Sequence, residues 1–347
     1  MSGDAHVRVG GDSALSGTAP VFAPRLLRRA TLIALLCGFG AMTMTAGAIE
    51  IQGHRGARGL LPENTIPAFE RAIELGVDTL ELDLGMTRDG VPVVHHDRAL
   101  DPNRTRDATG AWLTPPGPFL NALDLAELSE FDVGRAAPGS PVPERFPDQE
   151  PRDDTRIPTL AEVLALGRRP GAGAVRFNIE IKISPLVPQE TAGPAEFARA
   201  LVEVLQAEGM MNRADLQSFD WRVLHEARGL APEISTVCLT AEQPWHDNLL
   251  RGRPEPSPWT AGLDIDAFDG SVPRLVKAAG CAGWSPYYRD LTEETLAEAH
   301  ALGLRVVVWT VNEVSDMLTL ARLGVDGIIT DYPDRALEAL APWRSHE

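Results

Sequence analysis

Hydrophobic and polar side chains alternate strictly in residues 79–84, Thr-Leu-Glu-Leu-Asp-Leu, so the carboxylates share one face and the leucines the other. In a β-strand this alternation places Glu81 and Asp83 side by side, pointing the same way. Residues 50–54 and 178–183 follow the same pattern, with His54 and Glu180 among their polar positions. The three segments predict strands whose polar faces form an interior site at the strand ends, with helices packed outside.

Similar strand-like and helix-like segments alternate along the rest of the chain. Strands are predicted at residues 50–54, 79–84, 92–96, 176–183, 215–219, 234–239, 280–285, 305–311 and 327–330. Apolar residues recur at intervals of three and four in the predicted helices 65–75, 160–166, 194–208, 221–228, 292–302 and 314–323. Glycines that follow four of these helices are typical of helix ends. Repeated helix-glycine-strand units in one domain of this length predict an α/β fold, a (β/α)8 barrel.

The number of predicted strands is one too many for that barrel. The turn Arg88-Asp89-Gly90 is too short for a parallel crossover between segments 79–84 and 92–96. Either this pair forms a hairpin at the barrel rim, or one of the later segments is a loop.

The chain divides into a leader and one domain. Arginines at 25, 28 and 29 precede an uncharged run and the triplet Ala46-Gly47-Ala48, the layout of a secretory signal peptide at 1–48. We therefore expect a periplasmic or secreted protein without a stable membrane anchor, because the apolar run is shorter than the about 20 residues of a membrane span. Residues 49–347 are expected to form a single barrel domain. Within it, residues 98–158 are rich in Pro, Asp and Arg and predict a loop or cap insertion, helical only near 124–131.

Charge and cysteine content narrow the choice of partners and of covalent cross-links. The formal net charge of −17 argues against nucleic acid as a partner, and an anionic substrate would need local positive charge or a metal. An oxidising compartment permits a bridge between Cys238 and Cys281. However, neighbouring parallel strands rarely present the geometry of a disulfide, so two buried free thiols are the favoured expectation. The oligomeric state is left open by the sequence.

The candidate chemistry centres on the carboxylates Glu81, Asp83 and Glu180, which would converge at the mouth of the barrel. Two carboxylates about 4 Å apart repel each other by about 1–4 kcal/mol. Either one of them is protonated, or a cation lies between them. An all-oxygen ligand set favours Ca²⁺ or Mg²⁺ over zinc. The alternative is a salt-bridge network that uses Arg55 and Lys182.

Two histidines are expected beside these carboxylates. His54 ends one predicted strand, and His95-His96 end another, with their side chains on opposite faces. Because reactions on this fold run at that rim, one histidine of the pair is expected to act with His54, but alternation alone does not select it. Lys182 is one of only two lysines among 32 basic residues, which suggests a compact point charge near phosphate or carboxylates. Glu63 could lie near the metal or serve the start of a helix, and the structural role is favoured.

These residues form an ordered set that covers residues 50–340 and resembles the glycerophosphodiester phosphodiesterase family. The set comprises His54-Arg55-Gly56, Pro62-Glu63-Asn64-Thr65, Glu81-Leu82-Asp83, Thr87-Arg88-Asp89-Gly90, His96-Asp97, Ile157-Pro158-Thr159-Leu160, Glu180-Ile181-Lys182, Gln217-Ser218-Phe219, Trp309-Thr310-Val311-Asn312 and Gly327-Ile328-Ile329-Thr330-Asp331-Tyr332-Pro333. That family has a TIM-barrel fold. It hydrolyses glycerophosphodiesters to sn-glycerol 3-phosphate and an alcohol, with Ca²⁺ or Mg²⁺.

The resemblance implies a role for each candidate residue. It makes Glu81, Asp83 and Glu180 metal ligands, and His54 and His96 the acid–base pair. It selects His96 over His95 because the family's histidine directly precedes an aspartate. It places Arg55 and Lys182 on the phosphate and Trp309 at the rim that holds glycerol or alcohol. It also implies that the substrate's glycerol 2-hydroxyl is the nucleophile, so that a cyclic phosphate forms and water opens it.

Two alternatives remain, and one local departure from the family pattern bears on them. The run Leu100-Asp101-Pro102-Asn103-Arg104-Thr105 is longer than its counterpart in the family, which leaves the preferred alcohol open. A lysophospholipase D-type phosphodiesterase would need an apolar lip, for which Trp245, Trp259 and Phe268 are candidates. A non-catalytic periplasmic barrel that binds a metal or a ligand is the alternative of a different class.

Overall fold

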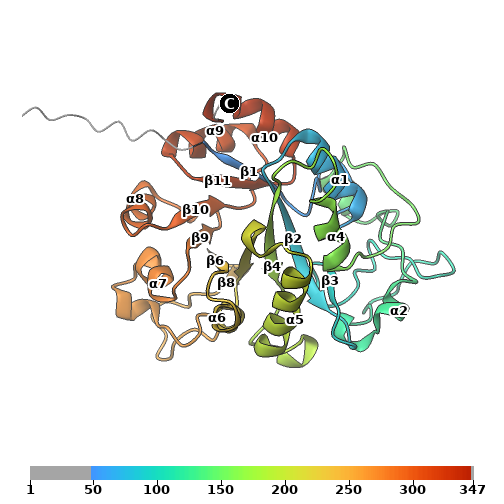
Figure 1. Ribbon diagram of the computed structural model, residues 1–347, viewed down its shortest axis with the longest axis horizontal. Coiled ribbons are helices and arrows are strands. Elements are labelled where there is room, and N and C mark those ends of the chain that lie inside the picture. Colours follow the sequence, from blue (N-terminus) through green and yellow to red (C-terminus); the bar gives the residue numbers. More distant parts are fainter. Residues whose placement is uncertain (1–47, 345–347) are drawn as a thin grey trace, which may run out of the picture. The chain divides into compact units, whose positions relative to one another are not determined.

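Eight parallel strands close into a barrel in the computed structural model, which describes residues 48–344 (Figure 1). The strands are β1 (Glu50–Gly53), β2 (Thr79–Met86), β4 (Arg176–Ile181), β5 (Ala214–Ser218), β6 (Ser235–Thr240), β9 (Gly283–Pro286), β10 (Arg305–Val308) and β11 (Gly327–Thr330). The sheet closes because β1 pairs with both β2 and β11. The predicted (β/α)8 fold is confirmed.

The ninth predicted strand, β3 (Pro92–Val94), belongs to a hairpin at the rim. It runs antiparallel to the end of β2, with Leu84 opposite Val94, and lies outside the closed barrel. Gly90 in the connecting turn has a φ of 81°, a backbone conformation that glycine adopts without strain. Of the two alternatives, the hairpin is therefore correct.

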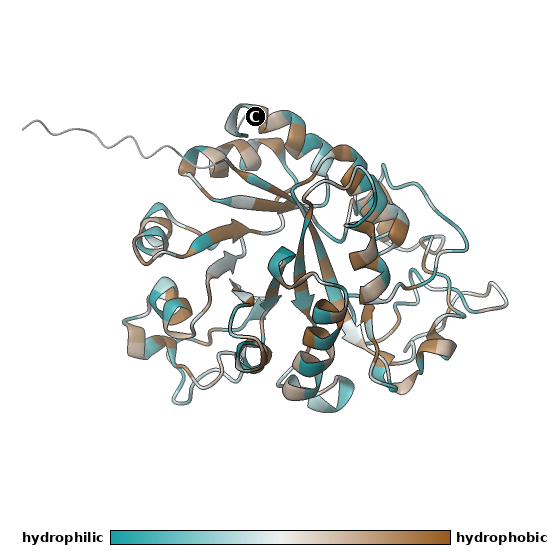
Figure 2. Ribbon diagram, in the orientation of Figure 1, coloured by the Kyte–Doolittle hydropathy of each residue, from teal (hydrophilic) through white to brown (hydrophobic). Residues whose placement is uncertain are grey.

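Helices follow the strands and pack around the barrel, and most of them lie where the sequence predicts them. They are α1 (Ile66–Leu75), α4 (Leu160–Leu166), α5 (Pro194–Ala207), α6 (Trp221–Leu230), α7 (Val272–Ala278), α8 (Glu293–Ala301), α9 (Val314–Leu323) and α10 (Pro333–Ala339). The α5 helix shows hydrophobic and hydrophilic faces (Figure 2) and buries five apolar side chains. The sequence did not predict α7 and α10, which have seven residues each.

A long segment between β3 and α4 builds the cap insertion expected at residues 98–158. It holds two single-turn helices, α2 (Leu125–Leu128) and α3 (Val142–Arg145). A small hydrophobic core of its own, with Leu100, Leu120 and Leu128, joins it to Val93 of β3. The insertion is therefore packed onto the rim beside the site. The predicted helix near 124–131 is confirmed as the short α2.

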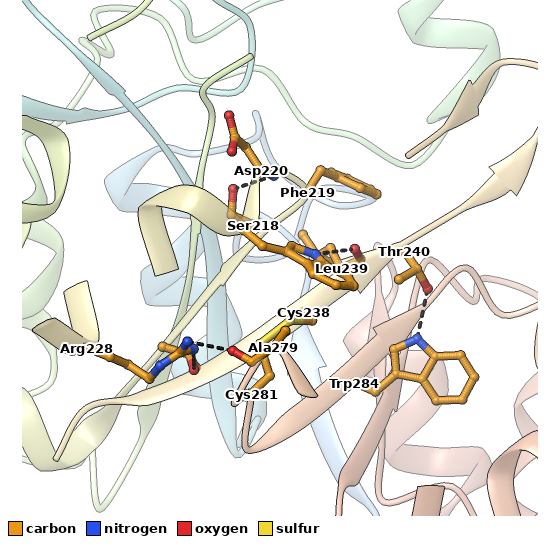
Figure 3. The surroundings of a disulfide bond; sticks show 12 residues. Ser218, Phe219, Asp220, Arg228, Cys238, Leu239, Thr240, Ala279, Cys281 and Trp284 are labelled. Carbon is orange, nitrogen blue, oxygen red and sulfur yellow. Dashed lines mark hydrogen bonds between the residues drawn. A yellow bond between two sulfur atoms is a disulfide. The ribbon is translucent and has the colours of Figure 1, made fainter. Parts of the chain in front are cut away.

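Cys238 and Cys281 form a disulfide, so the expectation of two free thiols is wrong (Figure 3). Cys238 lies in β6, but Cys281 precedes β9, which begins only at Gly283. The two Cα atoms are 5.9 Å apart, within the usual range for a bridge. The sequence argument failed because it placed both cysteines inside parallel strands.

No helix within residues 48–344 is long and apolar enough to cross a membrane. The predicted signal peptide lies outside the described residues.

Candidate active site

Three carboxylates meet at one end of the barrel, as the strand pattern predicts. Glu81 and Asp83 come from β2, and Glu180 comes from the neighbouring β4, directly opposite Asp83 in the strand register. One oxygen of each side chain lies within 4.8 Å of an oxygen of the other two. The three residues are only 1%, 0% and 8% exposed. Such proximity without solvent requires either positive charge nearby or protonation of one carboxylate.

The electrostatics of this cluster fit a bound cation. Burial, together with Asp83 and Glu180, raises the pKa of Glu81 well above its usual value. Burial also raises the pKa of Glu180. Burial opposes ionisation of Asp83, but Arg55 and Lys182 hold its pKa well below the usual value. Asp83 Oδ1 is buried and accepts no hydrogen bond from the described residues. These three oxygen donors suit a hard divalent cation.

His54 follows β1 and is held by a carboxylate from the far end of the chain. Its Nδ1 lies 2.6 Å from Asp331 Oδ1, and the Asn312 amide donates to the other Asp331 oxygen at 2.7 Å. Burial lowers the pKa of His54, although Asp331 opposes this. Burial opposes ionisation of Asp331, but its contacts with His54 and with the Asn312 amide keep its pKa low. A neutral His54 therefore donates its Nδ1 proton to Asp331. Its Nε2, 3.9 Å from Glu81 Oε2, stays free to accept a proton.

His96 has a similar partner on the other side of the cleft. Its Nδ1 lies 2.7 Å from Asp97 Oδ1. Burial and the nearby Arg55 and Lys182 lower the pKa of His96 to about 3. His96 lines the main cleft, whereas His95 lines a separate small cavity beneath the cap insertion. The histidine that the resemblance selects is thus the one that shares a cleft with His54.

Arg55 and Lys182 both contact the carboxylate cluster. Arg55 Nε lies 2.9 Å from Asp83 Oδ2, and its backbone N–H donates to Glu81 Oε2 at 3.0 Å. Lys182 Nζ lies 2.5 Å from Glu180 Oε1 and 3.2 Å from Asp83 Oδ1. The salt-bridge network considered as an alternative is therefore present. It supplies two positive side chains for three carboxylates, Glu81, Asp83 and Glu180.

Glu63 has a structural role, but not the one at a helix start that the sequence favours, because it lies before the N-cap Thr65 of α1 and pairs with three arginines. Its carboxylate pairs with Arg55 Nη1 at 2.6 Å, with Arg58 Nε at 2.5 Å and with the guanidinium of Arg104. Arg104 belongs to the cap insertion, so this cluster joins the insertion to the barrel rim. The three guanidinium groups hold the pKa of Glu63 well below its usual value, against the effect of burial. Glu63 thereby orients Arg55 toward the carboxylates.

Sequence reasoning assigned no role to four polar side chains that hold the site together. Asn64 donates to Asp83 Oδ2 at 2.8 Å, and Gln217 donates to Glu81 Oε1 at 3.1 Å. Asp331 and Asn312 orient His54, as described above. Gln217 and Asp331 lie at or just after the ends of β5 and β11. That position, the same as for the predicted ligands, is the signal that could have identified them.

The cleft above the cluster has a volume of about 1120 Å³. Charged side chains form its floor, and it includes Trp309, whose indole N–H donates to the Ser285 carbonyl at 3.0 Å. Trp245 and Trp259 also line it. Phe268, the third residue expected at an apolar lip, lies instead in the 3₁₀ helix Ile265–Phe268 and packs against the hydrophobic core. That part of the expectation is wrong, because residues 265–268 turn toward α7.

Comparisons with known proteins agree with this geometry. A crystal structure from Silicibacter pomeroyi, assigned to the glycerophosphoryl diester phosphodiesterases, is 37% identical with a TM-score of 0.75, covering 86% of this chain and 96% of that chain. The glycerophosphodiester phosphodiesterase of Bacillus subtilis is 30% identical over 289 residues, 81% of this chain and 83% of that protein. A phosphodiesterase from Oleispira antarctica, solved with the product sn-glycerol-3-phosphate, shares the fold at 23% identity and a TM-score of 0.62, covering 85% of this chain and 97% of that chain. The model of the "Glycerophosphoryl diester phosphodiesterase family" matches residues 54–335, and the chain therefore belongs to that family.

Proposed function

We propose that the protein hydrolyses glycerophosphodiesters to sn-glycerol 3-phosphate and an alcohol and that it requires a divalent cation, Ca²⁺ or Mg²⁺. One observation carries the proposal. His54 and His96, each paired with its own carboxylate, lie in one cleft beside three clustered carboxylates that could hold a cation, Glu81, Asp83 and Glu180. The names of the relatives described above support the same activity.

Glu81, Asp83 and Glu180 would hold the metal. When bound, it supplies charge that neutralises the phosphate oxygens and favours ionisation of the attacking hydroxyl group. Arg55 and Lys182 lie against the same carboxylates and would contact the phosphate. Trp309 would bound the part of the cleft that holds the glycerol or the alcohol.

The two histidines would move the protons. One imidazole takes the proton of the glycerol 2-hydroxyl while the hydroxyl oxygen bonds to phosphorus. The other imidazole gives a proton to the oxygen of the departing alcohol. Water then opens the cyclic phosphate with the two roles reversed. An internal nucleophile of this kind benefits from effective molarities of about 10⁵–10⁸ M. The negative charge of the phosphate raises the pKa of a neighbouring imidazole, which allows one of the two to act as the acid.

Turnover of glycerophosphocholine tests the activity and the metal requirement. We expect release of sn-glycerol 3-phosphate with Ca²⁺ or Mg²⁺, loss of activity in a chelator and recovery on adding either ion. A cyclic phosphate should accumulate transiently in ³¹P spectra. Full activity in chelator would contradict the metal requirement. Release of sn-glycerol 3-phosphate without any cyclic phosphate under single-turnover conditions would contradict the cyclic intermediate.

Substitution of the histidines tests their assignment. His96→Ala should lower turnover by about 10²–10⁴-fold, the usual contribution of a general acid or base. His95→Ala should stay near wild type, as should the control His225→Ala, whose side chain is exposed on α6. Equal losses for His95→Ala and His96→Ala would reverse the assignment. Variants of His54 and His96 that lose nothing measurable would instead support a non-catalytic binding barrel.

We also propose that the protein is exported to the periplasm or the medium. The leader pattern at residues 1–48 supports this, and so does the disulfide, because such bridges persist in oxidising compartments. The mature protein isolated from the expressing cell should begin at Ile49. Recovery of the uncleaved chain from the cytosol would contradict the proposal.

A further inference from the structure

Exposed hydrophobic side chains gather at the mouth of the active-site cleft. Within residues 48–344, five large hydrophobic side chains are exposed: Phe119 (37%), Leu186 (65%), Leu230 (50%), Trp245 (60%) and Val314 (40%). Three of them, Phe119, Leu186 and Trp245, line this one cleft. Single exposed apolar residues are ordinary on protein surfaces, whereas several around one opening mark a binding surface.

Trp245 belongs to an aromatic group at one side of the cleft. It lies in the turn between β7 (Glu242–Gln243) and β8 (His246–Asp247), a small hairpin that follows β6. Its ring centroid is 5.3 Å from that of Tyr287 and 6.1 Å from that of Trp309. Phe219 contacts Trp309 edge-on at 5.4 Å. These mutual contacts orient the rings toward one another, so they form one apolar surface.

Leu186 belongs to a second apolar segment that starts at the carboxylate cluster. It comes six residues after Glu180, beyond the end of β4, and its backbone N–H donates to Ser184 Oγ at 3.2 Å. Ile183 and Val187 of the same segment also line the cleft. Phe119, from the cap insertion, adds a third apolar contribution. The segment with Ile183, Leu186 and Val187 is thus continuous in sequence with β4, the strand that carries Glu180.

We propose that this mouth is a subsite for an acyl or alkyl chain of the substrate, so that the enzyme prefers monoacylated glycerophosphodiesters to those without a chain. This inference rests on the proposed function, because it takes the phosphodiester to bind over the charged floor. A chain on the glycerol 1-oxygen leaves the 2-hydroxyl free to attack phosphorus. The balanced reaction consumes one water, breaks the bond between phosphorus and the alcohol oxygen, and yields an acylated glycerol phosphate plus the alcohol.

Binding of alkyl phosphates tests the subsite without relying on turnover. Butyl, hexyl and octyl phosphate, each below its critical micelle concentration, are titrated calorimetrically into the full protein with Ca²⁺. Each buried methylene should tighten binding about two- to fourfold. Trp245→Ala and Leu186→Ser should flatten this dependence on chain length. Leu230→Ser, at a comparably exposed leucine at the end of α6 outside the cleft, should leave it unchanged.

The outcomes separate this inference from the proposed function. Affinity that does not change with chain length, or a dependence that survives both cleft substitutions, overturns the subsite. If the protein co-sediments with phosphatidylcholine vesicles and the affinity for alkyl phosphates does not depend on chain length, the exposed side chains bind a lipid surface. That result would also overturn the subsite. Failure of the wild-type protein to turn over glycerophosphocholine, in contrast, would overturn the proposed activity, whatever the alkyl phosphates show.

Discussion

Replacement of Asp331 by asparagine should invert the proton arrangement of His54. In the structure the Asp331 carboxylate accepts from His54 Nδ1 at 2.6 Å and from the Asn312 amide at 2.7 Å. Asn312 cannot turn its amide over without cost, because its own oxygen accepts the backbone N–H of residue 331 at 3.0 Å. An asparagine at 331 must therefore place its oxygen toward Asn312 and its NH₂ group toward His54. That NH₂ group favours the imidazole with its proton on Nε2.

The size of the effect follows from the two hydrogen bonds exchanged. A hydrogen bond to a charged group contributes about 1.5–3 kcal/mol, and the new neutral bond contributes about 0.5–1.5 kcal/mol in the opposite sense. The balance between the two forms of His54 thus shifts by about 2–4.5 kcal/mol. Because each 1.36 kcal/mol is tenfold in rate, kcat should fall by about 30- to 2,000-fold. KM should change little, since the proposed role of His54 is proton transfer and not binding of the substrate.

Kinetics and ring spectroscopy together check this reasoning. The kcat and KM for glycerophosphocholine are compared with the ¹⁵N shifts of the His54 ring, which report the protonated nitrogen. Asp326→Asn is the matched control, because Asp326 pairs with His300 at 3.0 Å outside the active-site cleft. A variant at Asp331 that keeps kcat within threefold, or that loses activity while His54 keeps its proton on Nδ1, would refute the argument.

Three further predictions concern stability. Ca²⁺ or Mg²⁺ at 100 times its Kd should raise the free energy of unfolding by about 2.7 kcal/mol and therefore raise the melting temperature. A melting temperature unchanged by both ions would exclude a metal site. The double variant Cys238→Ala, Cys281→Ala should lose about 4 kcal/mol of unfolding free energy, because the disulfide closes a loop of 43 residues in the unfolded chain. Denaturant unfolding measures this loss, and a loss below about 1 kcal/mol would show that the bridge does not form. Glu63→Gln should lower the free energy of unfolding by about 3–5 kcal/mol, because it leaves buried arginines without their partner. The control Glu74→Gln, at an exposed ion pair, should lower it by less than about 1 kcal/mol. Similar losses for the two variants would contradict the role of Glu63.

The local pattern was sufficient to predict the strands and the direction of their side chains. In β2, alternation alone placed Glu81 and Asp83 on the interior face, since side-chain direction in a strand depends only on the period of two. The position of Cys281, in contrast, was misjudged. β9 begins at Gly283 and not at residue 280, and the boundary of an element is not fixed by its own few residues.

Contacts between distant segments could not be predicted from the pattern. The pairing of Asp83 with Glu180 depends on the register between β2 and β4, which the closure of the whole barrel sets. Asp331 reaches His54, 277 residues away, because β11 is the neighbour of β1 only once the barrel is closed. Both contacts lie at the ends of strands, so the fold class indicates where to look for them but not which side chains touch.

The positions of two positively charged side chains explain how an acidic protein can hold an anionic substrate. The protein carries a formal charge of −17, yet Arg55 and Lys182 lie together at the floor of the cleft. Lys182 Nζ contacts Glu180 and Asp83, the residues that would bind the metal. A divalent cation on those carboxylates would compete with the ammonium group, which would then be free to contact a phosphate oxygen. If the proposed metal binds there, its occupation and the affinity for phosphate would be coupled through the charge of Lys182.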